Sequence, residues 1–245
     1  MPTVLRILGL DVAAVNSGAA VVEAVVEDGK VPTFRVLEER HLRTERMVGN
    51  QPPTWDSMLG VEKQAIYMAK VHGITHVVYE GYAKGSFGGK KKKDGSPGKG
   101  SNTTAYEHAE LVGIIKHGLH QQGDLVFMQV PVTTLSSFYG LTKGDKNATQ
   151  RMLKEDLGWV SGQRLKKWRE DCSDAAALAI IGCHVFAIIN GWDPGDSLAP
   201  SKHRVLFGDE RKSSPLTGML YRPHLYIPRD ACVVLEEEDD DESQG

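Results

Sequence analysis

The 245-residue sequence predicts an α/β fold, a five-stranded mixed sheet flanked by helices. Three extended segments follow one another at the N-terminus with no helical segment between them, which predicts three antiparallel strands. Helical and extended segments then alternate, and this order predicts two further strands added in parallel. Apolar residues make up 40% of the chain, which is enough to build a core.

The three N-terminal strands are expected at residues 4–10, 19–26 and 33–42. The first two are apolar runs, and the third alternates between polar and apolar residues. Asp28 and Gly29 supply a turn before the third strand.

The later elements are separated by prolines, glycines and changes of periodicity. Thr54 predicts the cap of the first helix, and His72 with Gly73 predicts its end. We expect the following order: helix 55–72, strand 76–79, helix 105–122, strand 125–130, and helices 133–139, 148–157 and 173–190.

The charge is unevenly distributed along the chain. The net charge is -3, but seven acids lie between Glu236 and Glu242, so residues 1–235 carry a net charge of +4. The three cysteines form no C-x-x-C pair, which argues against a zinc ribbon or a disulfide scaffold and favours a reducing cytoplasm. We expect no signal peptide. The apolar run at 175–189 is shorter than the ~20 residues that span a bilayer, so a buried helix is expected there.

Four carboxylates lie at the ends of predicted elements. Asp11 ends the first strand, Glu80 ends the fourth, and Asp171 and Asp174 are expected to open the long helix. Each acid alone could cap a turn or a helix. Together they would gather at one edge of the sheet and repel one another unless a cation lies between them.

Oxygen ligands of this kind suit Mg²⁺ or Mn²⁺, and four carboxylates can serve two ions. Two metals about 3.5 to 4 Å apart stabilise the entering and leaving oxygens of a displacement at phosphorus. The residues therefore predict phosphodiester hydrolysis.

The segments ILGLDVAAVNSG, VVYEG and DCSDAAALAI resemble the RuvC family of Holliday-junction resolvases, within the RNase H-like superfold. The resemblance covers about residues 4–190 and includes PVTTLSSFYGLTKGDKNATQ. It implies that Asp11, Glu80, Asp171 and Asp174 are metal ligands and that Lys146 lies beside the scissile phosphate. It also implies a homodimer, in which the helix at 105–122 could pair, that nicks opposed strands of four-way junctions.

The sequence departs from this family at three places. Val12 and Ala13 stand where the family has Pro-Gly after the first aspartate. A second family lysine falls on Leu135, so Lys143 would have to take its role. The aromatic wedge expected after the glutamate falls on Ala83, with aromatic residues only nearby.

A glycine- and lysine-rich segment follows Glu80, and we expect a mobile basic loop at residues 84–104. A merely solvated loop is an equal alternative, but its place beside the carboxylates favours DNA binding. The expected DNA-binding residues are Lys84, Lys90, Lys91, Lys92, Lys93, Lys143, Arg151, Tyr82 and Phe87.

Residues 1–190 are thus expected to form the nuclease domain. Residues 191–245 are expected to form a C-terminal extension with a disordered acidic tail. The expected partner is branched DNA, including forks and flaps, and the expected place is the cytoplasm, with the nucleoid.

Two other functions are compatible with parts of the sequence. An actin-like or sugar-kinase-type ATPase also has a first strand ending in aspartate, but it needs a second glycine-rich phosphate loop, which the sequence lacks. A non-catalytic junction-binding protein would gain nothing from four acids at metal-like spacing.

Overall fold

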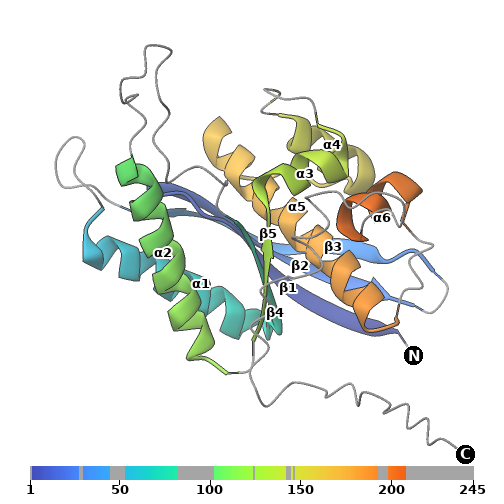
Figure 1. Ribbon diagram of the computed structural model, residues 1–245, viewed down its shortest axis with the longest axis horizontal. Coiled ribbons are helices and arrows are strands. Elements are labelled where there is room, and N and C mark those ends of the chain that lie inside the picture. The colour runs from blue at the N-terminus through green and yellow to red at the C-terminus, as the bar shows by residue number, and fades with distance from the viewer. Residues whose placement is uncertain are drawn as a thin grey trace, which may run out of the picture.

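The computed structural model describes residues 2–27, 30–44, 53–81, 102–123, 125–141, 145, 147–192 and 198–207, without the side chains of residues 102–105 and 132. Five strands form one sheet in the order β3-β2-β1-β4-β5 (Figure 1). They are β1 (Thr3–Asp11), β2 (Asn16–Val26), β3 (Thr33–Arg43), β4 (His76–Glu80) and β5 (Val126–Val130). The first three pair antiparallel, and β4 and β5 add in parallel, which confirms the predicted mixed sheet.

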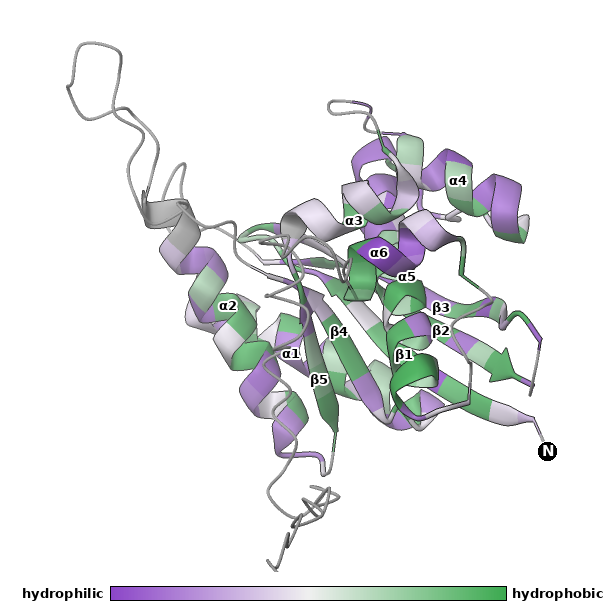
Figure 2. Ribbon diagram, turned by 45° about the vertical axis from the view of Figure 1, so that its right-hand side comes forward, coloured by the Kyte–Doolittle hydropathy of each residue, from purple (hydrophilic) through white to green (hydrophobic). Residues whose placement is uncertain are grey.

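Helices cover both faces of this sheet (Figure 1). One face carries α1 (Trp55–His72) and α2 (Asn102–His120). The other carries α5 (Lys166–Ile189), beside which lie α3 (Val132–Tyr139), α4 (Ala148–Leu157) and α6 (Pro200–Phe207). Figure 2 shows that β1, β5 and much of α5 are hydrophobic, whereas α4 is largely hydrophilic.

The ends of α1 and the bounds of α4 are as predicted. The Thr54 hydroxyl accepts a hydrogen bond from the Ser57 amide at 3.3 Å, and Gly73 ends α1 with a φ of 59°. Helix α2 begins at Asn102, three residues earlier than expected, so the end of the predicted loop at 84–104 is helical.

The apolar side of α2 belongs to the core. Leu111, Ile115 and Leu119 are buried in one cluster with residues of α1 and the sheet. These residues of the helix that the family resemblance suggests could pair in a homodimer therefore belong to the core of the single chain.

The expectation that Asp171 and Asp174 open the long helix was wrong, because α5 begins at Lys166. The residues before Asp171 are good helix formers without glycine or proline, and Cys172 and Ser173 are buried, so the helix continues across this point. The predicted start of the helix was based only on the apolar run at 175–189. Helix α5 is long and apolar enough to cross a membrane, but 83% of its most apolar stretch is buried within the protein, as in a core helix.

Glycines let α5 lie directly against the backbone of the sheet. A Cβ added at Gly9 of β1 would lie 2.0 Å from the Ala175 carbonyl oxygen. A Cβ added at Gly18 of β2 would lie 2.0 Å from the Asp171 carbonyl oxygen. No side chain fits at either place, so the two glycines fix the position of the start of α5 over β1 and β2.

Candidate functional site

The register of the parallel strands brings Asp11 and Glu80 side by side. Leu10 of β1 lies opposite Tyr79 of β4, and each strand ends one residue later at a carboxylate. The carboxyl ends of parallel strands meet at one edge of a sheet. The two acids therefore share that edge.

Both acids also point toward the face that α5 covers. Side chains alternate between the faces of a strand, and Gly9 and Val78, two residues before the acids, contact α5. Asp11 and Glu80 thus fall on the side of α5, as the sequence predicts for a carboxylate cluster.

Helix α5 adds the second pair of acids. Asp11 pairs with Gly18, and the backbone of Asp171 lies against Gly18, so Asp171 enters beside Asp11. The Asp171 side chain is only 2% exposed. Asp174 follows almost one turn later and is partly buried.

The pKa values of three acids show that the carboxylates share one electrostatic environment. Burial raises the pKa of Asp11 well above its usual value, and the charges of Glu80, Asp174 and Asp171 raise it further. Burial, then the charge of Asp174, raises the pKa of Glu80 to about 7. Burial also raises the pKa of Asp174 to about 6, against a lowering hydrogen bond from Thr149.

Lys167 supplies positive charge to this cluster. Its ammonium group donates a hydrogen bond to Asp171 Oδ1, and its charge lowers the pKa of Asp11, Glu80 and Asp174. Burial disfavours the charged lysine, but the hydrogen bond and charge of Asp171 prevail and raise the pKa of Lys167.

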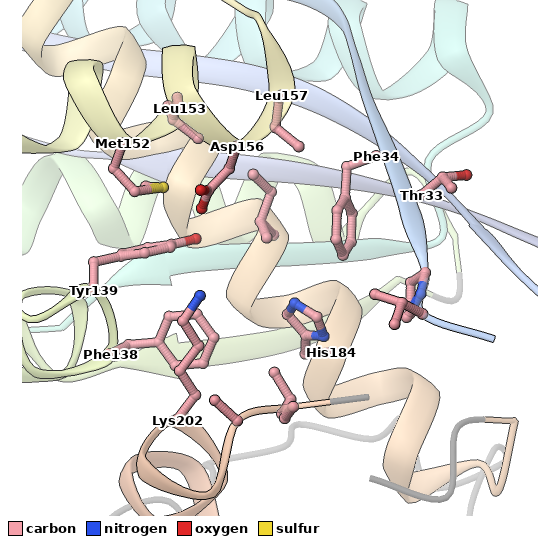
Figure 3. A pocket seen from close by; sticks show the side chains of 15 residues that line it. Thr33, Phe34, Phe138, Tyr139, Met152, Leu153, Asp156, Leu157, His184 and Lys202 are labelled. Atoms are coloured by element: carbon pink, nitrogen blue, oxygen red, sulfur yellow. The ribbon is translucent and has the colours of Figure 1, made fainter. Parts of the chain in front are cut away.

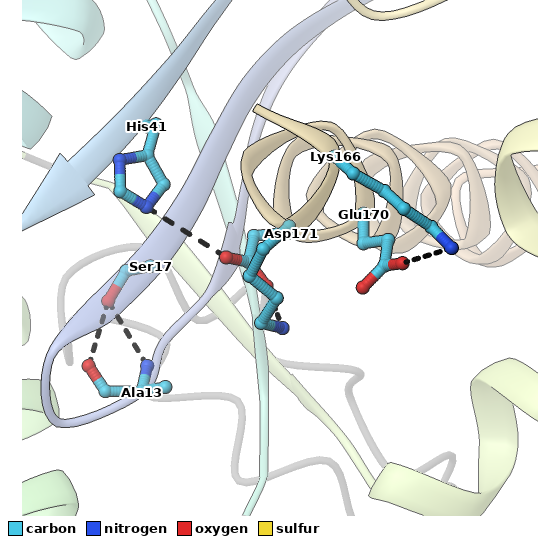
Figure 4. Close-up of polar contacts among 7 residues, drawn as sticks. Ala13, Ser17, His41, Lys166, Glu170 and Asp171 are labelled. Atoms are coloured by element: carbon cyan, nitrogen blue, oxygen red, sulfur yellow. Dashed lines mark hydrogen bonds and ion pairs between the residues drawn. The ribbon is translucent and has the colours of Figure 1, made fainter. Parts of the chain in front are cut away.

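The second oxygen of Asp171 faces β3 (Figure 4). His41 Nε2 lies 3.9 Å from Asp171 Oδ2, which is too long for a hydrogen bond. The His41 ring stacks on Trp168 with centroids 4.4 Å apart and planes 15° apart. Burial lowers the pKa of His41, which favours its neutral form. Within the described residues, Asp171 Oδ2 is buried and has no hydrogen-bond partner.

The turn after Asp11 is fixed without the Pro-Gly of the family. The Ser17 hydroxyl accepts a hydrogen bond from the Ala13 amide at 3.1 Å and donates one to the Ala13 carbonyl at 3.0 Å (Figure 4). The Thr44 hydroxyl donates to the Ala14 carbonyl at 2.5 Å, and the Thr44 amide donates to the Val15 carbonyl at 3.0 Å. These bonds close the turn from both sides.

The four carboxylates fit a divalent metal in chemistry and charge. They are oxygen donors, the charges of neighbouring acids raise the pKa values of Asp11, Glu80 and Asp174, and within the described residues a buried oxygen of Asp171 has no hydrogen-bond partner. In the described part of the chain, no three histidine, cysteine or acidic side chains converge closely enough to hold one ion. In this structure the ammonium group of Lys167 lies against Asp171, and the acids do not converge on a single point.

Apart from the four carboxylates, most of the predicted site residues lie outside the described residues. Lys143 and Lys146 are two of them. The same holds for Tyr82, Lys84, Phe87, Lys90, Lys91, Lys92 and Lys93. Arg151 is described: it is exposed on α4 and forms an ion pair with Asp145. Leu135, where the family has a lysine, is only 8% exposed and belongs to the core.

A cavity of about 560 Å³ lies away from the carboxylates (Figure 3). Its walls include Phe34, Phe138 and Tyr139, and the Lys202 ammonium lies 5.1 Å from the centre of the Phe138 ring. Phe34 stands near the start of β3, whereas the acids lie beside its end, so the cavity and the acids occupy opposite ends of the strands. The candidate site is therefore the carboxylate edge and not this cavity.

No family model and no curated protein matches the sequence. Solved structures that match include two of RuvC from Thermus thermophilus. One, described as a RuvC structure, gives a TM-score of 0.52 at 16% identity, and the complex with a Holliday junction substrate gives 0.51 at 15% identity. Each match covers 77% of this chain and 97% of the RuvC chain.

A complex of Fowlpox virus resolvase with Holliday junction DNA gives a TM-score of 0.40 at 11% identity, over 74% of this chain and 99% of that one. Because the RuvC structures are only 15% and 16% identical to this chain in sequence, the similarity supports the fold alone. The order of the strands, the two helical layers and the matched share of the chain all agree with it. The chain has a RuvC-like fold of the RNase H-like type.

Proposed function

We propose that the protein is a metal-dependent endonuclease that cuts four-way junctions and other branched DNA. The observation that carries the proposal is the gathering of Asp11, Glu80, Asp171 and Asp174 at one edge of a RuvC-like sheet. A cluster of acids in which burial and neighbouring charges raise the pKa values of Asp11, Glu80 and Asp174 is typical of a functional site. The solved RuvC complex with its junction substrate supports the choice of DNA.

In this proposal the four carboxylates hold two Mg²⁺ or Mn²⁺ ions. When bound, such ions supply an activated water and stabilise the charge on the phosphate oxygens. The chain itself orients the donors. Gly18 fixes the backbone of Asp171, and Thr149 donates a hydrogen bond to Asp174. Burial keeps water from screening the acids.

DNA would approach along the exposed cations around this edge. Lys166 is 62% exposed at the start of α5, and Arg151 is 59% exposed on α4. The sequence holds further lysines, Lys143, Lys146 and those of 84–99, which we assign to DNA binding, with Lys146 at the scissile phosphate. Cutting both strands of a four-way junction calls for two active sites, so a homodimer belongs to the proposal.

Replacing Asp11 with asparagine tests the proposal. Asp11→Asn keeps the size of the side chain but removes a charge from the centre of the cluster, so cleavage of a labelled four-way junction with Mn²⁺ should fall by at least ~10³-fold. Binding of the junction in EDTA should remain. Asp156→Asn, at an exposed aspartate of α4 outside the cluster, is the matched control and should cut normally.

Undiminished nicking by purified Asp11→Asn would refute the assignment of this site. Binding of the junction by the wild-type protein with no Mg²⁺- or Mn²⁺-dependent cut would favour a non-catalytic binder. ATP hydrolysis in the absence of DNA would favour the ATPase.

A further inference from the structure

Lys167 stands where the physics of helices disfavours a cation. It lies in the first turn of α5, which has no acidic residue, and the N-cap residue Leu165 makes no side-chain hydrogen bond. The N-terminus of a helix carries partial positive charge, so lysines there cost stability. A lysine four residues before an acid is also the less favourable order of an ion pair on a helix. The stability of the helix therefore does not explain Lys167.

The side chain of Lys167 connects solvent with the buried acids. It is 64% exposed, yet its ammonium group contacts Asp171, whose side chain is 2% exposed. The same ammonium acts on Asp11, Glu80 and Asp174, because its charge lowers the pKa of each. Lys167 thus contacts Asp171 directly and acts on the other three carboxylates through its charge.

We infer that Lys167 is the counter-ion of the four carboxylates when no metal is bound, and that its ammonium leaves Asp171 when a divalent ion binds. The inference rests on the proposed function for the presence of the metal. Two cations among the same acids repel each other, and the divalent ion gains more from them. The four-carbon stem is already mostly exposed, so the ammonium can turn to solvent without repacking the core.

The measurement is the affinity of the full-length protein for Mn²⁺, by calorimetry without DNA and without turnover. Lys167→Gln removes the competing charge, so it should bind Mn²⁺ at least ~10-fold more tightly than the wild-type protein. Lys167→Met should do the same, and Lys167→Arg, which keeps the charge, should bind no more tightly than the wild type. The control is Lys166→Gln, which alters a neighbouring lysine of equal exposure whose partner is Glu170 at 3.9 Å. It should leave the affinity within about twofold.

Circular dichroism verifies that each variant is folded. Equal or weaker binding of Mn²⁺ by folded Lys167→Gln and Lys167→Met, while the wild type cuts junctions with Mn²⁺, would overturn the inference and leave the proposed function standing. Failure of the wild type and both variants to bind Mn²⁺, together with failure to cut, would overturn both. An equal gain in affinity from Lys166→Gln would show a general surface effect and would also overturn the inference.

Discussion

Glu80 is held at the inner edge of the sheet with a pKa of about 7, well above its ordinary value of 4.5. Burial favours the protonated form in the folded protein, and the neighbouring charge of Asp174 adds to this effect. A carboxyl whose pKa is raised on folding stabilises the fold below its unfolded pKa. That stabilisation is lost as the pH rises through the folded pKa. The contribution of Glu80 to the stability of the metal-free protein therefore falls as the pH rises from 4.5 to about 7, and the loss is complete above that pH.

Glu80→Gln should remove this pH dependence. In EDTA at pH 8 the variant should be more stable than the wild type, by up to about 3 kcal/mol at roughly 1.4 kcal/mol for each pKa unit. At pH 4 the two proteins should unfold alike. Thermal unfolding at a series of pH values measures the difference, and an unchanged or lower Tm at pH 8 would contradict it.

Asp11 and Glu80 could be placed from the sequence because strand ends and the alternation of side chains are local properties. His41 and Thr149 could not, because their contact with the acids depends on tertiary packing. The register between β2 and β3 shifts at Val21 and Val22, so counting along the chain does not give the place of His41. Lys167 stands in a run of basic residues at 164–169 of the sequence, but its contact with Asp171 depends on α5 starting at Lys166.

Among the elements, α5 determines the geometry of the site through its close approach to β1 and β2. The sequence indicated its apolar part, but its charged first two turns lack the apolar periodicity by which the helix was recognised. Its docking depends on Gly18, whose missing side chain leaves room for the Asp171 carbonyl.

Gly18→Ala should therefore disrupt the docking of α5. A methyl group 2.0 Å from a carbonyl oxygen forces the backbone apart, so a loss of about 3 kcal/mol or more in the free energy of unfolding is expected. Gly60→Ala in α1 is the matched control, since nothing lies within 4 Å of an added Cβ there. It should stabilise the protein by up to about 1 kcal/mol. Urea unfolding compares the two, and similar stabilities would argue against the close contact.

At the scale of the whole molecule, charge is separated between a basic body and an acidic tail. Residues 1–235 carry +4 and the ten residues after Leu235 carry -7. The sequence shows this separation directly, because charge depends on composition and not on folding. We expect the acidic tail to compete with DNA for the basic segments, and we expect salt to weaken this competition because it shortens the screening length.

A chain ending at Leu235 should bind four-way junctions more tightly than the full chain at about 50 mM salt, because the competing acids are removed. The difference should shrink toward 300 mM salt, where the charges are screened. Fluorescence anisotropy over a salt series measures both affinities. A chain in which the seven acids of 236–242 become Ser or Asn controls for length and should behave like the shortened one.

Helix α5 contributes many residues to one core cluster, and it carries Asp171 in its second turn and Asp174 at the start of its third. At Gly9 the backbone of this helix lies so close to the strand that ends in Asp11 that no side chain fits between them. Mutations in this region therefore affect two properties at once, because a substitution that changes the packing of the core also changes the spacing of the acids. Substitutions on the hydrophilic surface of α4 should be tolerated. At the contact of α5 with β1 and β2, a substitution on one element should require a compensating substitution on the other.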